Sequence, residues 1–214
     1  YHLFVIASYG KIIPQNILEI PKYGTLNVHP SLLPLYRGPS PIESALLNGE
    51  PSTGVTIIKL DDLMDHGPIL VQTKYNYNQN DTSGTLEVSL GQLGGELLTQ
   101  VLPAYLDGTL LVKEQDHTKA TLCKKITKDL GKISLEDLAH DVRKKWRALS
   151  PWPGLYFFIN HNDKEMRIKV NSVDLTVLVD DDSKANSVIL KVTPEGKKEI
   201  TWEEFCRGYL LTYP

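Results

Sequence analysis

Residues 25–38 read TLNVHPSLLPLYRG, a short apolar strand that ends in polar side chains and continues into a loop with two prolines. Asn27 and His29 lie where this strand ends, and a second hydrophobic strand, residues 55–60, leads into a loop with three aspartates. An amide, an imidazole and a carboxylate at the ends of neighbouring strands can orient a carbonyl, carry a proton and stabilise an oxyanion. The sequence therefore predicts a catalytic site here, although spacing alone does not decide which aspartate belongs to it.

The bulk composition is that of a globular protein. The chain has 214 residues, of which 41% are hydrophobic and 23% charged, enough to bury a sizeable core in one or two domains. No apolar run approaches the roughly 20 residues that a membrane-spanning helix needs. Cys123 and Cys206 form no disulfide framework, and the histidines lack the spacing of metal ligands. We therefore expect reduced thiols, no metal and no membrane partner.

Charge is unevenly distributed along the chain, whose net charge is −3. Residues 1–108 hold 5 Lys and Arg against 10 Asp and Glu, whereas residues 119–169 hold 12 against 6. A basic block beside an acidic half predicts contact with a polyanion, and the alternative is a solvated, lysine-rich surface.

The first part of the chain alternates strands and helices, which is the pattern of an α/β domain. Residues 3–7 are an uninterrupted apolar run, as expected for a strand that is covered on both faces. Leucines at helical spacing predict a long amphipathic helix over residues 85–102, whose glycines permit close packing on the sheet. The full set of expected elements is strands 3–7, 25–28, 55–60 and 69–75 and helices 14–19, 41–48 and 85–102.

The second part of the chain reads as short strands separated by polar turns. One helix is predicted to start at Ser134 and to stop before Pro151, and a last short helix is capped at Thr201. The expected strands are 155–159, 166–170, 173–179 and 188–192. A run of short strands with turn signals favours a small β-barrel. Residues 109–127 lack periodicity and are predicted to be a linker.

Several of these stretches resemble the folate-dependent formyltransferases. Those in the second part resemble the methionyl-tRNA formyltransferase branch of that family. The stretches that carry the resemblance are Ser31–Pro34, Arg37-Gly38, Thr53–Thr56, Lys125–Lys128, Leu149–Gly154 and Phe205–Tyr209. Together they cover essentially the whole chain.

The resemblance implies a fold and a domain division. We expect an α/β Rossmann-like formyltransferase domain over residues 1–108, a linker over 109–127 and a small OB-like β-barrel domain that binds tRNA over 128–214. The catalytic domain of the family usually begins with three further strand–helix units, which do not precede Leu3 here. The chain is therefore expected to be N-terminally truncated or partial, with the C-terminal half of that domain.

The resemblance also implies a reaction, transfer of a formyl group from 10-formyltetrahydrofolate to the α-amino group of methionyl initiator tRNA. Asn27 would donate a hydrogen bond to the formyl oxygen, His29 would polarise that oxygen and help to move a proton, and Asp65 would favour the charged imidazole. The register Asp-His-Gly-Pro-Ile favours Asp65 among the three aspartates. Residues expected to bind the folate are Gly10, Lys11, Ile12, Ile13, Ser31, Leu32, Leu33, Pro34, Asp61 and Asp62; a place in the core is the alternative for Ile12 and Ile13.

Basic residues supply the expected contacts to tRNA. They are Arg37, Lys124, Lys125, Lys128, Arg143, Lys144, Lys145 and Arg147. For Arg37 the alternative is support of the loop. Two rival functions remain: a formyltransferase that acts on a sugar-nucleotide or purine-precursor amine, and an inactive RNA-binding fragment. A monomer is expected. Small sequence variants such as His29-Pro30 resemble mitochondrial members of the family more than bacterial ones. They favour the mitochondrial matrix as the location, with the bacterial cytoplasm as the alternative.

Overall fold

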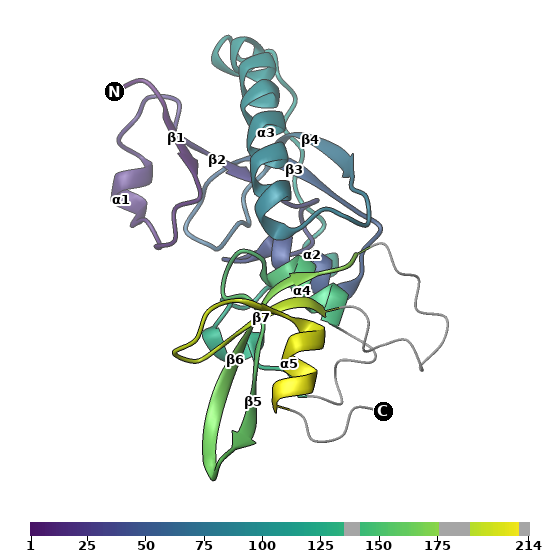
Figure 1. The fold of residues 1–214 in the computed structure, drawn as a ribbon. Helices are drawn as coiled ribbons and strands as arrows, with labels where there is room; N and C mark the ends of the chain where they lie inside the picture. The colour runs from purple at the N-terminus through teal and green to yellow at the C-terminus, as the bar shows by residue number, and fades with distance from the viewer. Residues whose placement is uncertain (135–141, 176–188, 210–214) are drawn as a thin grey trace. The chain divides into compact units, whose positions relative to one another are not determined.

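The computed structural model of the chain describes residues 1–134, 142–175 and 189–209, which form two compact units (Figure 1). The first unit comprises residues 1–77 and 84–125, and the second comprises residues 78–83 and 126–214. Each unit is built around a four-stranded sheet of its own.

The first unit contains a mixed sheet with the strand order β1-β2-β3-β4. β1 pairs with β2 in parallel, whereas β2 with β3 and β3 with β4 are antiparallel. The strands are β1 (Phe4–Ala7), β2 (Thr25–His29), β3 (Ser52–Lys59) and β4 (Ile69–Asn76), and the helices are α1 (Gln15–Leu18), α2 (Pro41–Asn48), α3 (Ser83–Leu106) and η1 (His117–Lys119). All the elements predicted for this part are present, with α3 extending beyond the predicted helix at both ends.

Helix α3 packs its leucines against the apolar strands of this sheet. Leu86 and Leu90 on the helix and Leu26 and Ile57 on the strands are at most 1% exposed. Gly94 allows the close approach, because a Cβ atom there would lie only 2.4 Å from the Val28 side chain. The other two predicted packing glycines, at positions 91 and 95, have no neighbouring atom within 4 Å of such a Cβ and face open space.

The segment 109–125, most of the stretch predicted to be a linker, lies in the first unit and pairs with it at two places. Lys113 exchanges backbone hydrogen bonds of 2.8 Å with Ile69. Further along, the Arg37 N–H donates to the Thr121 carbonyl and the Cys123 N–H donates to the Arg37 carbonyl, both at 2.8 Å. Isolated bridges of this kind leave no hydrophobic period in the sequence, so pattern analysis did not detect them.

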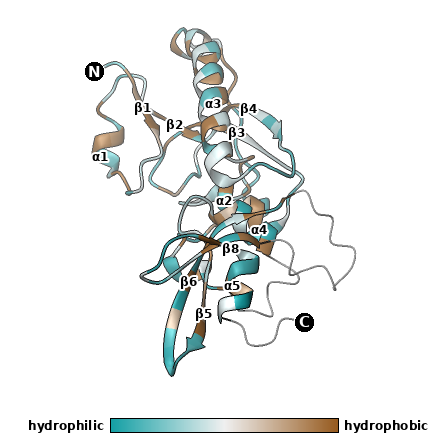
Figure 2. Ribbon diagram, viewed as in Figure 1, coloured by the Kyte–Doolittle hydropathy of each residue, from teal (hydrophilic) through white to brown (hydrophobic). Residues whose placement is uncertain are grey.

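The second unit contains an antiparallel sheet with the order β5-β6-β7-β8. Its elements are η2 (Lys128–Gly131), α4 (Val142–Leu149), β5 (Tyr156–His161), β6 (Lys164–Val173), β7 (Ile189–Pro194), β8 (Ile200–Thr201) and α5 (Trp202–Tyr209). Phe157 and Phe205 are at most 1% exposed and pack with Trp202, which fixes α5 on the sheet. The outer part of the β5–β6 hairpin is hydrophilic (Figure 2).

The cap predicted for the last helix is present as a reciprocal pair of hydrogen bonds. The Glu204 N–H donates to the Thr201 hydroxyl at 3.2 Å, and the Thr201 N–H donates to the Glu204 carboxylate at 2.9 Å. This capping box satisfies backbone donors that the first turn of a helix leaves without an intrahelical partner.

Three predictions for the second unit differ from the structure or fall outside it. The described strands form an open sheet, so the predicted OB-like barrel is not confirmed within residues 142–175 and 189–209. β6 is one strand to Val173, and most of the separate strand predicted over 173–179 lies outside the described residues, as does most of the first half of the predicted helix from Ser134. Among the helices of the described residues, none has both the length and the apolar character that crossing a membrane requires.

Candidate active site

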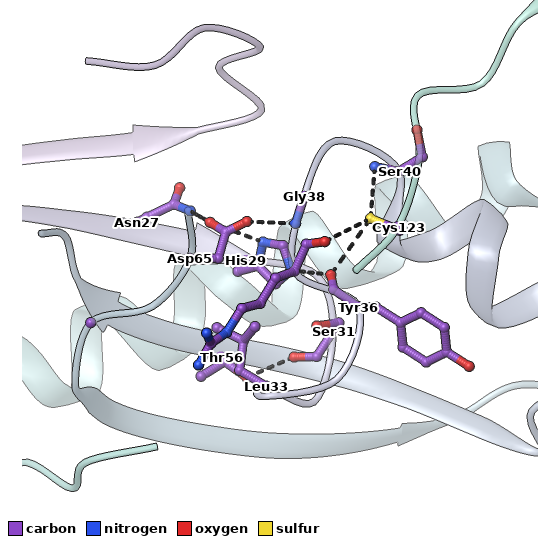
Figure 3. Close-up of polar contacts among 12 residues, drawn as sticks. Asn27, His29, Ser31, Leu33, Tyr36, Gly38, Ser40, Thr56, Asp65 and Cys123 are labelled. Atoms are coloured by element: carbon purple, nitrogen blue, oxygen red, sulfur yellow. Dashed lines mark hydrogen bonds and ion pairs between the residues drawn. The ribbon is translucent and has the colours of Figure 1, made fainter. Parts of the chain in front are cut away.

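The three residues predicted to be catalytic converge at the end of β2, where Asp65 is the common partner (Figure 3). One oxygen of its carboxylate, Oδ1, accepts a hydrogen bond from Asn27 Nδ2 at 3.2 Å and lies 3.6 Å from His29 Nδ1. The other, Oδ2, accepts from the Gly38 N–H at 2.8 Å. The Asp65 side chain is only 13% exposed. An amide, an imidazole and a carboxylate are thus held together in a largely water-excluded place.

The three side chains were predicted to lie at the ends of neighbouring strands. They do meet, but the ends of β2 and β3 do not lie side by side. β3 is antiparallel to β2, so its last residue, Lys59, pairs with Leu26 near the beginning of β2. The loop after β3 must therefore turn back to bring Asp65 to His29. Asp65 adopts a left-handed backbone with a φ of 47°, which side-chain-bearing residues rarely adopt without support.

Gln115, which sequence analysis did not identify, supports this returning loop. Its side-chain amide donates to the carbonyls of Asp65 and Gly67, both at 2.8 Å, and its Oε1 accepts from Arg37 at 2.7 Å. The residue is 5% exposed, and its bonds to Arg37 and to the Gly67 carbonyl are buried, whereas the bond to the Asp65 carbonyl is partly buried. Gln115 lies in the predicted linker, where no sequence signal indicated a role.

His29 is 4% exposed, and burial lowers its pKa below the usual value. The nearby Asp65 carboxylate and the contact with the Tyr36 carbonyl act in the opposite direction, but desolvation is the largest influence. Sequence reasoning expected the carboxylate to favour the charged imidazole. Asp65 does act in that direction, but the cost of burying the cation is larger, so the pKa of His29 lies below its usual value and the neutral imidazole is favoured at neutral pH.

The apolar loop that was predicted to bind folate is fastened to the sheet. The Thr56 hydroxyl donates to the Ser31 carbonyl at 2.6 Å and accepts from the Leu33 N–H, and Gln72 donates to the Leu33 carbonyl at 2.9 Å. Ser31 and Leu33 are buried, whereas Leu32 and Pro34 are partly exposed. A rigid loop therefore presents Leu32 and Pro34, while Ser31 and Leu33 serve to hold it.

The other residues predicted to bind folate lie in two further places. Gly10, Lys11 and Ile12 are exposed beyond β1, and Ile12 is 82% exposed, so a place in the core does not fit it. Ile13 lines a hollow beside β1. In the loop after β3, Asp62 is exposed and Asp61 pairs with His66 Nδ1 at 2.7 Å.

The residues predicted to contact tRNA divide by their surroundings. Lys124, Lys125, Lys128 and Lys144 are exposed. Arg37 is 7% exposed and donates to Gln115 and to His117, so its burial fits support of the loop and leaves the guanidinium out of reach of a phosphate backbone. Arg143 and Lys145 are partly exposed, and Arg147 donates to the backbone carbonyls of Asp81 and Asn78.

The chain matches two family models that together span both units. The model described as formyl transferase matches residues 2–102, and the model for the C-terminal domain of formyl transferases matches residues 125–187. The chain is therefore a member of the formyl transferases, a family of enzymes.

Two bacterial relatives make this assignment more particular. A methionyl-tRNA formyltransferase from Dictyoglomus thermophilum is 38% identical over 223 aligned residues, which cover 97% of this chain and 72% of that protein. One from Chloroflexus aggregans is 47% identical over 154 residues, which cover 72% of this chain and 50% of that protein. Within the formyl transferases the chain belongs to the methionyl-tRNA formyltransferases, and it spans half the length of the Chloroflexus relative. These relatives give no support to the predicted mitochondrial location.

A solved structure shares the fold. HypX from Aquifex aeolicus, determined in complex with tetrahydrofolic acid, superposes with a TM-score of 0.69 at 16% identity, and the match covers 97% of this chain and 39% of that chain. At this identity the likeness concerns the fold alone.

Proposed function

We propose that the protein transfers a formyl group from 10-formyltetrahydrofolate to the α-amino group of methionyl initiator tRNA. The observation that carries the proposal is the buried cluster in which the Asp65 carboxylate gathers Asn27 and His29. Membership of the methionyl-tRNA formyltransferases supports the choice of donor and acceptor.

Each of the three residues has a role that its contacts allow. Asn27 uses one amide hydrogen in the bond to Asp65, and the second can donate to the formyl oxygen, where negative charge develops when the amine attacks. Burial lowers the pKa of His29 and so favours the neutral imidazole, which can accept the proton that the amine loses. Asp65 then faces the imidazolium with a carboxylate oxygen 3.6 Å from Nδ1 and stabilises it.

The steps balance without any further reactant. The amine nitrogen bonds to the formyl carbon, its proton moves to His29, and the tetrahedral oxyanion is stabilised by Asn27. The bond between this carbon and N10 of the folate then breaks as N10 regains a proton from the imidazolium. The products are formylmethionyl-tRNA and tetrahydrofolate.

The folate and the tRNA would use different parts of the chain. The partly exposed Leu32 and Pro34 offer apolar contacts to the folate. The exposed lysines of the basic block, among them Lys128 and Lys144, offer contacts to tRNA phosphates. We retain as proposals the division into a catalytic part (1–108), a linker (109–127) and an OB-like tRNA-binding part (128–214), and also a monomeric state. The bacterial relatives favour the bacterial cytoplasm as the location.

Transfer of label from 10-formyltetrahydrofolate to a panel of acceptors tests the proposal. The panel contains methionyl initiator tRNA, methionyl elongator tRNA, an amino sugar nucleotide and a purine-precursor amine, and a His29→Gln variant is the control. Labelling of initiator tRNA that is lost in the variant supports the proposal. Labelling of a small amine instead identifies a different formyltransferase, and tRNA binding without any transfer identifies an inactive RNA-binding protein.

A further inference from the structure

The catalytic histidine is held by a backbone carbonyl. His29 Nε2 lies 2.9 Å from the carbonyl oxygen of Tyr36 (Figure 3). A carbonyl oxygen can only accept, so Nε2 must carry the hydrogen in this contact. In the neutral imidazole the other nitrogen, Nδ1, is then unprotonated, and this atom faces the Asp65 carboxylate at 3.6 Å. Two proton acceptors therefore lie side by side.

Tyr36 is fixed through its backbone and its side chain. Its backbone is left-handed, with a φ of 61°. This conformation is unfavourable for a tyrosine and persists only where surrounding contacts stabilise it. The Tyr36 N–H donates to the Thr121 hydroxyl at 2.8 Å, and the phenol donates to Glu50 at 2.6 Å and accepts from Asn48 at 3.0 Å. Relaxation of this residue would turn its carbonyl away from His29.

Resting on the proposed function, we propose that Tyr36 is a positioning residue whose clamped carbonyl fixes His29 in the Nε2–H tautomer, so that Nδ1 takes the proton from the attacking amine. The amine N–H bond breaks as the new C–N bond forms, and the proton goes to the Nδ1 lone pair. The same proton passes to N10 of the folate as the C–N10 bond breaks.

The opposite tautomer would move the acceptor to the wrong side of the ring. With a hydrogen on Nδ1, the imidazole would donate toward Asp65, and its free lone pair would lie on Nε2, which faces the Tyr36 carbonyl oxygen. Asp65 and the Tyr36 carbonyl compete for the single hydrogen of the neutral imidazole, and the 2.9 Å contact at Nε2 is closer than the 3.6 Å contact at Nδ1. Asp65 is the charged group that acts on His29, and the Cys123 thiol, whose pKa is raised by burial and which therefore stays protonated, lies 3.7 Å from the Tyr36 carbonyl.

The matched substitutions are Thr121→Val, which removes the acceptor for the Tyr36 N–H at an exposed position, and Thr121→Ser, which retains it. Thr109→Val, at another exposed threonine of the same segment, is the control. Tyr36→Phe removes the phenol contacts by a separate route and serves if Thr121→Val does not fold. A ¹H–¹⁵N spectrum of the imidazole nitrogens reads the tautomer directly, with the His29 signals assigned by their loss in His29→Gln.

The expected result is a proton on Nε2 alone in the unsubstituted protein. Thr121→Val and Tyr36→Phe should give a mixture of tautomers and a kcat lowered by about 10-fold to 100-fold, the range for a displaced catalytic group. Thr121→Ser should restore both readouts, and Thr109→Val should change neither. A proton on Nδ1 in the unsubstituted protein, or unchanged tautomer and kcat in the folded variants, overturns the inference. If the expected tautomer is found but no acceptor is formylated, the proposed function is overturned, and with it the catalytic role of Nδ1. The positioning of His29 by Tyr36 would still stand.

Discussion

The first unit has two histidine–aspartate pairs, which differ in the distance between their atoms and in their exposure to solvent. In the pair His66–Asp61 the atoms are 2.7 Å apart, and the side chains are 29% and 32% exposed. In the pair His29–Asp65 the atoms are 3.6 Å apart, and the side chains are 4% and 13% exposed. The closer pair already has its hydrogen bond, whereas the wider and more deeply buried pair can still accept a proton. We therefore propose that the pair with the weaker contact is the reactive one.

The largest effect should come from the two aspartates. Asp65→Asn removes the charge that stabilises the imidazolium and weakens the support for Asn27 and Gly38, so kcat for formyl transfer should fall by about 10²-fold to 10³-fold. Asp61→Asn should lower kcat by less than about threefold, because an exposed pair contributes little. Steady-state kinetics with methionyl initiator tRNA makes the measurement. An equal loss in both variants would remove the distinction between the pairs.

The two histidines provide the next comparison. His29→Gln removes the proton acceptor and should lower kcat by about 10²-fold, whereas His66→Gln should leave it within about threefold. Circular dichroism and thermal unfolding confirm that both variants are folded. Turnover of His29→Gln close to that of the unsubstituted protein would show that another group accepts the proton.

The pH dependence sharpens the comparison further. Burial lowers the pKa of His29 below its usual 6.5, so kcat/KM should be retained at pH 6.5 and should fall only as the pH drops through that lower value. Asp65 raises this pKa, so the residual activity of Asp65→Asn should have its acid limb at lower pH. His66→Gln should leave the limb in place. A limb that does not move in Asp65→Asn would mean that His29 does not control it.

The same shift predicts a change in stability with pH. Because the folded-state pKa of His29 lies below the unfolded value, the unfolded chain binds more protons in acid. The stabilisation is complete above the unfolded pKa of 6.5 and is lost as pH falls through the folded value. Urea unfolding between about pH 7.5 and about pH 5 should show this loss, and His29→Gln should make the dependence flatter.

The smallest effect should come from the exposed charges. Lys144→Glu should raise KM for tRNA by about threefold to tenfold and flatten its salt dependence, with folate binding unchanged. Lys197→Glu, an exposed lysine outside the basic block, is the control and should have little effect. If tRNA binding is the same in both variants, the basic block is only a solvated surface.

Sequence reasoning located most of the strands, the long helix and the three convergent residues. These features could be predicted because hydrophobic periodicity and local motifs involve residues that are close together in the sequence. It missed Gln115, Tyr36 and Thr121, whose roles depend on backbone contacts between segments that are far apart in the chain. It gave the direction in which Asp65 acts on the pKa of His29 but not the larger opposing effect, since the cost of burial depends on the complete fold and not on the nearest carboxylate.

The bonds between residues 121–123 and the loop after β2 constrain how the gene can be shortened or lengthened. A chain ended at Gly108 would keep every strand of the first sheet and yet lose the hydroxyl that holds Tyr36 and the backbone bonds to Arg37. Lys113 pairs with Ile69, and Gln115 donates to the Asp65 carbonyl, so both residues are attached to the first unit. An insertion between them should therefore break one of these two attachments. The exposed residues 116–119 are the place where extra residues should do least harm.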